Sequence, residues 1–176
     1  MDKESDNHTV AANAILISQA ALLDQLLTHW QLAPKYGFSV SVFIIDTDRF
    51  SQLENKSACF EKILAAVHSQ FHRETDFIAR FNRKQIMAIS SHMNFHQTTQ
   101  LAKRIHKAVA ALEIFHPYSP TGRYATVSIG HTTYAPKADD GYGVLDFLTT
   151  VWKHLRQAKQ SGGNCSKTRL HSRVLQ

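Results

Sequence analysis

Apolar side chains recur every three or four positions along four stretches of the chain, the spacing that buries one face of an amphipathic helix. Pro34 is expected to close the first stretch, because proline interrupts helical hydrogen bonding, and Gly162-Gly163 stops the last one. This periodicity predicts four helices, at residues 13–31, 59–71, 95–112 and 144–158.

Shorter apolar runs lie between these stretches and have the alternation or the unbroken hydrophobicity of strands. One run ends abruptly in Asp46-Thr47-Asp48, and the polar link Asn82-Arg83-Lys84 joins two runs as a hairpin turn does. The predicted strands cover residues 38–45, 77–81, 85–90 and 124–133.

The predicted order is helix, strand, helix, hairpin, helix, strand, helix. This order is typical of an α/β (α+β) fold with a ferredoxin-like βαββαβ core, in which helices flank a mixed sheet. Residues 166–176 are polar and basic, and we expect them to form a tail.

Composition narrows the class of protein. The chain has 176 residues, of which 43% are hydrophobic, enough for one domain with its own core. Its net charge of +6 favours anionic partners. Two distant cysteines, Cys59 and Cys165, argue against a disulfide framework and a four-ligand zinc site. No apolar run approaches the roughly 20 residues of a membrane span, and the N-terminus is unlike a secretory signal, so we expect a cytoplasmic protein.

Several short strings are similar to motifs of one family. Residues 46–50 (DTDRF) resemble D-x-D-x-F, residues 126–130 read T-V-S-I-G, and residues 158–164 are similar to A-K-x-x-G-R-N. The spacing of the family's opening motif, D-x-L-T-x-L-x-N, is met by Asp6, Thr9 and Asn13. Together they resemble the GGDEF domain of bacterial diguanylate cyclases. The resemblance implies a nucleotidyl-cyclase-like domain at 13–165, an N-terminal segment at 1–12 and the tail at 166–176.

The family's signature hairpin is replaced. Where the resemblance calls for G-G-[DE]-E-F, this chain has Asn82-Arg83-Lys84-Gln85-Ile86. In active members the glycines let the phosphates of GTP approach the backbone, and the acidic third position binds magnesium with the first aspartate of D-x-D. Lys84 at that position is expected to repel the cation and to pair with Asp46.

Two further departures concern the nucleotide. Glu54 aligns with the family's guanine-reading asparagine, and Gly163 aligns with its phosphate-binding arginine, although Lys159 is kept. We therefore expect no catalytic residues, no metal, no cofactor and no cyclase activity. Residual cyclase activity, or weak cation binding at Asp46 and Asp48, is the alternative.

One family motif is retained. Arg73 and Asp76 match the R-x-x-D inhibitory site, with the family's five-residue offset before Asn82. The resemblance implies that this site binds cyclic di-GMP, commonly as a stacked dimer, away from the catalytic pocket. Arg104 aligns with the second arginine of that site, and Arg80 is a weaker neighbouring candidate.

These residue types suit a guanine dinucleotide. An arginine fork can bond guanine O6 and N7 or a phosphate, and a carboxylate can accept from guanine N1 and N2. The competing interpretation is an exposed Arg–Asp ion pair, worth less than about 1 kcal/mol.

The sequence thus favours an inactive GGDEF-like domain that acts as a cyclic di-GMP receptor in bacterial signalling. Its ligand would bridge a homodimer or a protein partner. The alternative is a ligand-free interaction or dimerisation module.

Two other features of the sequence do not predict a binding site. His68 and His72 have the spacing of metal ligands on a helix, but no third ligand accompanies them. The basic residues at 121–123 and in the tail lack a recognition helix or an aromatic platform, so no nucleic-acid partner is expected.

Overall fold

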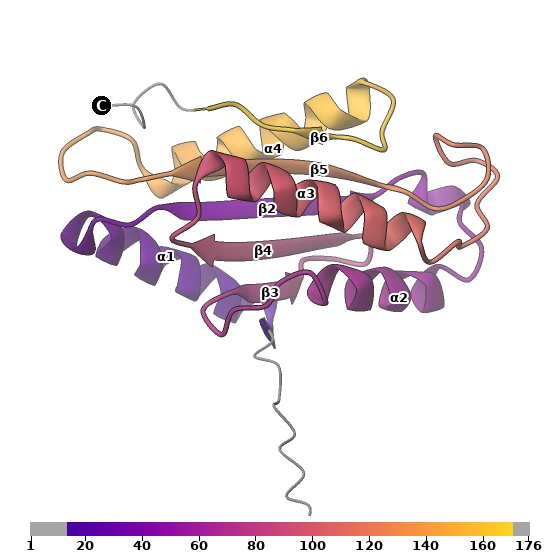
Figure 1. Cartoon of the computed structure of the whole chain (residues 1–176), viewed down its shortest axis with the longest axis horizontal. Helices are drawn as coiled ribbons and strands as arrows, with labels where there is room; N and C mark the ends of the chain where they lie inside the picture. The colour runs from indigo at the N-terminus through magenta and orange to yellow at the C-terminus, as the bar shows by residue number, and fades with distance from the viewer. Residues whose placement is uncertain (1–13, 171–176) are drawn as a thin grey trace, which may run out of the picture.

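The computed structural model describes residues 14–170, which form one six-stranded sheet covered by two α-helices on each face (Figure 1). The helices are α1 (Gln19–Tyr36), α2 (Lys56–His68), α3 (Phe95–Ala110) and α4 (Val144–Gln160). The strands are β1 (Ile15–Ile17), β2 (Val40–Thr47), β3 (Phe77–Arg80), β4 (Gln85–Ser91), β5 (Val127–Tyr134) and β6 (Ser166–Lys167). The predictions on residues 1–13, including Asp6, Thr9 and Asn13, and on 171–176 lie outside the described residues.

The ferredoxin-like core is confirmed. The sheet order is β1-β3-β4-β2-β5-β6, and the four central strands pair antiparallel. Along the chain, β2, α2, β3, β4, α3 and β5 follow one another as βαββαβ. Because β1 and β6 pair parallel to β3 and β5, the complete sheet is mixed.

The first predicted helix differs from the observed one at both ends. Residues 15–17 form the edge strand β1, and α1 begins after Ser18, whose Oγ accepts a 3.2 Å hydrogen bond from the Ala21 N–H. Pro34 lies inside α1 near its end, and the helix ends at Gly37, which has φ 69°. A proline so close to the C-terminus removes one hydrogen bond without stopping the helix, and the left-handed glycine terminates it.

The expected tail also differs. Ser166 and Lys167 form β6, which pairs with Ile129 and Gly130 of β5. A strand of two residues has no hydrophobic period, so the sequence pattern could not reveal it.

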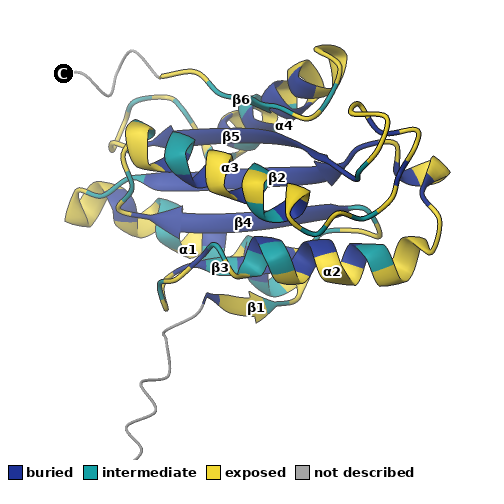
Figure 2. Cartoon of the chain, turned by 45° about the vertical axis from the view of Figure 1, so that its right-hand side comes forward, coloured by how far each residue is buried: buried dark blue, intermediate teal, exposed yellow. Residues whose placement is uncertain are grey.

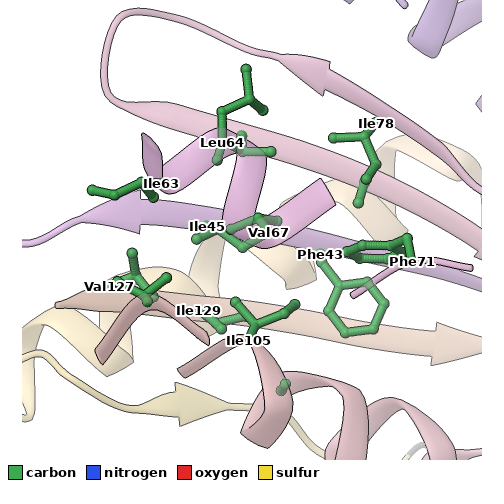
Figure 3. Packing of buried hydrophobic residues seen from close by; sticks show 14 of the residues in the cluster. Phe43, Ile45, Ile63, Leu64, Val67, Phe71, Ile78, Ile105, Val127 and Ile129 are labelled. Atoms are coloured by element: carbon green, nitrogen blue, oxygen red, sulfur yellow. The ribbon is translucent and has the colours of Figure 1, made fainter. Parts of the chain in front are cut away.

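Strand β2 is buried at all eight positions and divides the core into two clusters (Figure 2). Its residues Phe43 and Ile45 face α2 and α3, where they pack in the cluster that Figure 3 shows. Its residues Val42 and Ile44 face α1 and α4. Successive side chains of a strand point to opposite faces, which explains why this central strand reads as a continuous apolar run.

Helix α4 approaches β5 closely at Gly130. A Cβ added there would lie 2.3 Å from the Leu155 nitrogen and 2.5 Å from the Val151 oxygen. The glycine of the T-V-S-I-G string is therefore required for packing.

Candidate functional site

The turn between α2 and β3 holds Arg73 and Asp76 against each other. A guanidinium nitrogen of Arg73 lies 3.3 Å from Oδ1 of Asp76, and the Arg73 backbone N–H donates to Oδ2 at 3.3 Å. Asp76 is buried, with 3% of its surface exposed, whereas the Arg73 side chain is 40% exposed. The pair therefore presents the guanidinium outward over a buried carboxylate.

Ser90 of β4 completes this pair, and sequence reasoning missed it. Its Oγ donates a 2.7 Å hydrogen bond to Oδ1 of Asp76 and accepts one from the Arg73 guanidinium. The antiparallel register of the hairpin places Ser90 beside the start of β3, since Phe77 faces Ile89. That register was the signal that could have identified it.

Arg73 and Asp76 line a cavity of about 360 Å³, which we call the arginine pocket, and Arg104 of α3 lines it as well. Its lining also includes the exposed residues His72 and His96. Among residues 14–170, the Arg104 guanidinium has no hydrogen-bond or ion-pair partner. Two guanidiniums and one carboxylate thus line one pocket.

Arg80 lies apart from this pocket. Its guanidinium pairs with Glu61 of α2 and sits 5.0 Å from the centre of the Phe60 ring. The guanidinium of Arg80 therefore has protein partners and does not need a ligand to neutralise it.

A second hollow lies at the other end of the β3–β4 hairpin. This cavity of about 460 Å³, the hairpin cavity, is formed by the end of β2, the hairpin turn and the loop after α4. It corresponds to the position of the D-x-D and G-G-[DE]-E-F motifs in the sequence, and both Asp46 and Asp48 line it.

Asp46 is already neutralised by protein groups. Its Oδ2 accepts a 2.6 Å hydrogen bond from the Gln85 side chain and lies 3.3 Å from the Lys159 ammonium. Its Oδ1 is buried without a partner among the described residues. The expected pairing with Lys84 is wrong: Lys84 lines the cavity, but Lys159 and Gln85 hold the carboxylate. Lys159 reaches Asp46 because α4 packs close to the sheet.

Asp48, unlike Asp46, is held by hydrogen bonds alone. Its carboxylate accepts hydrogen bonds of 2.6 Å from Thr126 and Ser128 and one of 2.9 Å from the backbone N–H of Asn164. Gly163 has φ 78°, and a Cβ there would lie 2.9 Å from the Asp48 carboxylate. Asp48 therefore fixes the loop after α4, and the close contact explains why residue 163 is a glycine.

His131 of β5 is buried, and His106 of α3 is half-buried. Burial, and then the neighbouring His154 and His106, lower the pKa of His131 to about 4. Burial also lowers the pKa of His106, with a smaller opposing effect of Asp48, and His106 Nε2 lies 2.7 Å from the Ser166 hydroxyl.

His68 and His72, which have the sequence spacing of metal ligands, make different contacts. The Nε2 atom of His68 lies 2.6 Å from the Ala14 carbonyl oxygen, and His72 lines the arginine pocket. Within residues 14–170, no three side chains of His, Cys, Asp or Glu gather as a metal site would require. In the same part of the chain, none of the helices combines the length and hydrophobicity needed to cross a bilayer.

Solved structures of GGDEF domains share this fold. The GGDEF domain of DgcB from Caulobacter crescentus, solved in complex with c-di-GMP, is 17% identical, with a TM-score of 0.71 over 95% of this chain and 98% of that one. The active GGEEF domain of a diguanylate cyclase from Vibrio cholerae is 16% identical, with a TM-score of 0.72 over 90% of this chain and 100% of that one.

A third structure is diguanylate cyclase SiaD from Pseudomonas aeruginosa, in complex with its activator SiaC. It is 18% identical, with a TM-score of 0.71 over 86% of this chain, and the match spans 58% of the SiaD chain. No curated protein sequence matches this chain. The profile of the family described as "Diguanylate cyclase, GGDEF domain" matches residues 14–165. The chain therefore belongs to the GGDEF domain family.

Proposed function

We propose that this GGDEF domain binds cyclic di-GMP in the arginine pocket and does not synthesise it. The observation that carries the proposal is the convergence of Arg73, Asp76 and Arg104 on one pocket. The complex of the DgcB domain with c-di-GMP supports the choice of ligand. A receptor of this kind would act in the bacterial cytoplasm, the compartment expected from the sequence.

The chemistry of the pocket suits a guanine dinucleotide. The exposed guanidiniums of Arg73 and Arg104 can bond guanine O6 and N7 or a phosphate. A carboxylate has about four acceptor positions, and Asp76 uses three of them for Arg73 and Ser90. One position is left for a donor on guanine, so Asp76 would serve mainly to orient Arg73.

We infer the absence of cyclic di-GMP synthesis from the side chains that line the hairpin cavity. A divalent cation fits its side chains poorly. Lys159 and Gln85 already hold Oδ2 of Asp46, three donors hold the carboxylate of Asp48, and Oδ1 of Asp46, which has no partner among the described residues, is buried. The Lys84 ammonium would repel it as well. Phosphoryl transfer from GTP depends on such a cation, so we infer that the domain has no cyclase activity.

Titration calorimetry of cyclic di-GMP into the whole chain tests the proposal. We expect binding by the parent protein and a loss of affinity of about tenfold or more in Arg73→Ala and in Arg104→Ala. Arg123→Ala removes the same charge outside both cavities and should bind like the parent. Absence of heat with the parent protein would refute the receptor function.

A ligand-free interaction module is the second candidate function. Two large aromatic side chains in the loop before β5, Phe115 and Tyr118, are 67% and 61% exposed, which favours contact with another protein. An oligomeric mass and a melting temperature that do not respond to cyclic di-GMP would favour this candidate, since a ligand at about a hundred times its Kd adds about 2.7 kcal/mol of stability.

A further inference from the structure

A third hollow lies between helix α4 and the start of β4. This cavity of about 550 Å³, the α4 pocket, is lined by one residue of the hairpin, Gln85, and by five of the helix: Trp152, Leu155, Arg156, Lys159 and Gln160. Trp152, Arg156 and Lys159 follow one another at intervals of four and three residues, so a single face of α4 presents all three to the pocket. The volume lies in the range of small-molecule sites.

The aromatic wall of the α4 pocket is supported by the hairpin. The Trp152 ring is half-buried, and its centre lies 5.5 Å from the centre of the Phe81 ring, with 58° between the two planes. Phe81 is itself fixed, because its backbone N–H donates a 2.9 Å hydrogen bond to the Gln85 carbonyl oxygen. Trp152 therefore offers a preorganised aromatic surface, and a ligand that packs on it pays little for ordering the side chain.

Two of the polar side chains in the pocket are committed to protein partners. The Gln85 amide donates to Asp46 and accepts from Asn82, each at 2.6 Å. The Lys159 ammonium, which also lines the hairpin cavity, lies 3.3 Å from the Asp46 carboxylate. These contacts hold one wall of the pocket rigid and leave Arg156 and Gln160 as its available polar groups.

Arg156 supplies the uncompensated charge. Its side chain is exposed and has no ion-pair or hydrogen-bond partner among residues 14–170. No Asp or Glu is among the residues that line the pocket, and the sequence has none after Asp146. A guanidinium without a protein counter-ion thus lies one helical turn from the Trp152 ring.

We propose that the α4 pocket binds a small molecule made of a flat aromatic ring and a carboxylate. The ring would pack on Trp152 and Leu155, and the carboxylate would accept two parallel hydrogen bonds from the Arg156 fork. The Gln160 amide can donate to the same carboxylate or accept from a polar substituent of the ring. A cation would be repelled by Arg156, and an uncharged ring would leave the guanidinium without a partner.

An NMR titration of the isotope-labelled whole chain with 2-naphthoate tests this site. The chain has two tryptophans, Trp30 and Trp152, and therefore two indole N–H signals, which Trp152→Phe assigns. We expect a saturable shift of the Trp152 signal and little change in the signal of Trp30, which packs against Tyr134 and Phe147.

Two analogues separate the contributions of the ligand. 2-Naphthamide keeps the ring and lacks the charge, and cyclohexanecarboxylate keeps the charge and lacks the aromatic ring. Each should bind about tenfold or more weakly than 2-naphthoate, because each loses one of the two contacts.

Arg156→Ala should weaken the binding of 2-naphthoate about tenfold or more. The side chain is exposed on the helix surface, so the fold should persist, as circular dichroism would verify. Lys153→Ala is the matched control: it removes one positive charge from an exposed position of the same helix that does not line the pocket, and it should bind like the parent.

Three results would overturn the proposal: no shift of the Trp152 signal, equal affinity for 2-naphthoate and either analogue, or equal affinity in Arg156→Ala and Lys153→Ala. The proposal is independent of cyclic di-GMP recognition, since Arg73→Ala should lose the dinucleotide and keep 2-naphthoate. Loss of 2-naphthoate binding in Arg73→Ala would locate the acid in the arginine pocket and would also refute the assignment.

Discussion

The Oγ atom of Ser90 donates a 2.7 Å hydrogen bond to Oδ1 of Asp76 and accepts one from the guanidinium of Arg73. One buried hydroxyl of β4 thereby connects both ends of the R-x-x-D motif. The arrangement of the arginine pocket depends on the hairpin register that brings β4 beside the start of β3.

Replacing Ser90 tests whether this hydroxyl positions Arg73. Ser90→Ala leaves Oδ1 of Asp76 with one donor fewer, so we expect stability to fall by roughly 1 kcal/mol or more and cyclic di-GMP affinity to fall about fivefold. Urea unfolding and calorimetry measure the two effects. The neighbouring Ser91→Ala removes a partly buried hydrogen bond to His29 and should lower stability without changing affinity for cyclic di-GMP. Equal affinity in Ser90→Ala and the parent would contradict the positioning role.

His131 should make the fold sensitive to acid. Both ring nitrogens are buried without partners among the described residues, and the pKa is about 4 in the folded chain against the ordinary 6.5. Below pH 6.5 the unfolded chain binds the proton that the folded chain rejects, so stability is full above pH 6.5 and is lost as pH falls toward 4. The loss amounts to about 3 kcal/mol at about 1.4 kcal/mol for each pKa unit.

Urea unfolding across this pH window measures the effect, with His131→Phe as the comparison. The ring of His131 stacks on Phe43 at 5.2 Å, so phenylalanine keeps the aromatic contact and removes the titration. The variant should have a flatter pH profile, with a residual slope from His154 and His106, whose pKa values burial also lowers. Identical slopes for the variant and the parent would show that His131 is not responsible.

Gly130→Ala should destabilise the domain through the contact between β5 and α4. The added methyl would overlap backbone atoms of Val151 and Leu155, which cannot rotate away, and overpacking of this kind costs about 1–3 kcal/mol. Gly143→Ala is the comparison, since its Cβ would meet the Asp146 carboxylate at 3.6 Å, an ordinary van der Waals contact. An unfolding midpoint for Gly130→Ala as high as that of the parent would refute the close approach.

Incubation with GTP and magnesium should yield no cyclic di-GMP. Protein donors contact the carboxylates of Asp46 and Asp48, and Lys84 stands where the family pattern has an acidic residue. Chromatography of the nucleotides measures the product, and an active GGDEF domain serves as the positive control. Any product that accumulates with time and is abolished by EDTA would show that the domain is a cyclase.

The helices and central strands could be predicted from the sequence because each is long enough for its hydrophobic pattern to repeat. The helices repeat it over several turns, and the strands over several pairs of residues. The strings around Asp46, Gly130 and Lys159 also indicated the family, since their order along the chain does not depend on folding. The resemblance to the R-x-x-D motif likewise implied that Arg73, Asp76 and Arg104 lie together.

Tertiary structure alone decided which groups meet. Strands β1 and β6 are three and two residues long and exist only through pairing with β3 and β5. The partner of Asp46 is Lys159, 113 positions away, and not the nearer Lys84. Ser90 contacts Asp76 and Arg73, and Arg80 pairs with Glu61, for the same reason. Local periodicity fixes which face of an element a side chain occupies, whereas sheet register and helix packing fix what lies opposite that face.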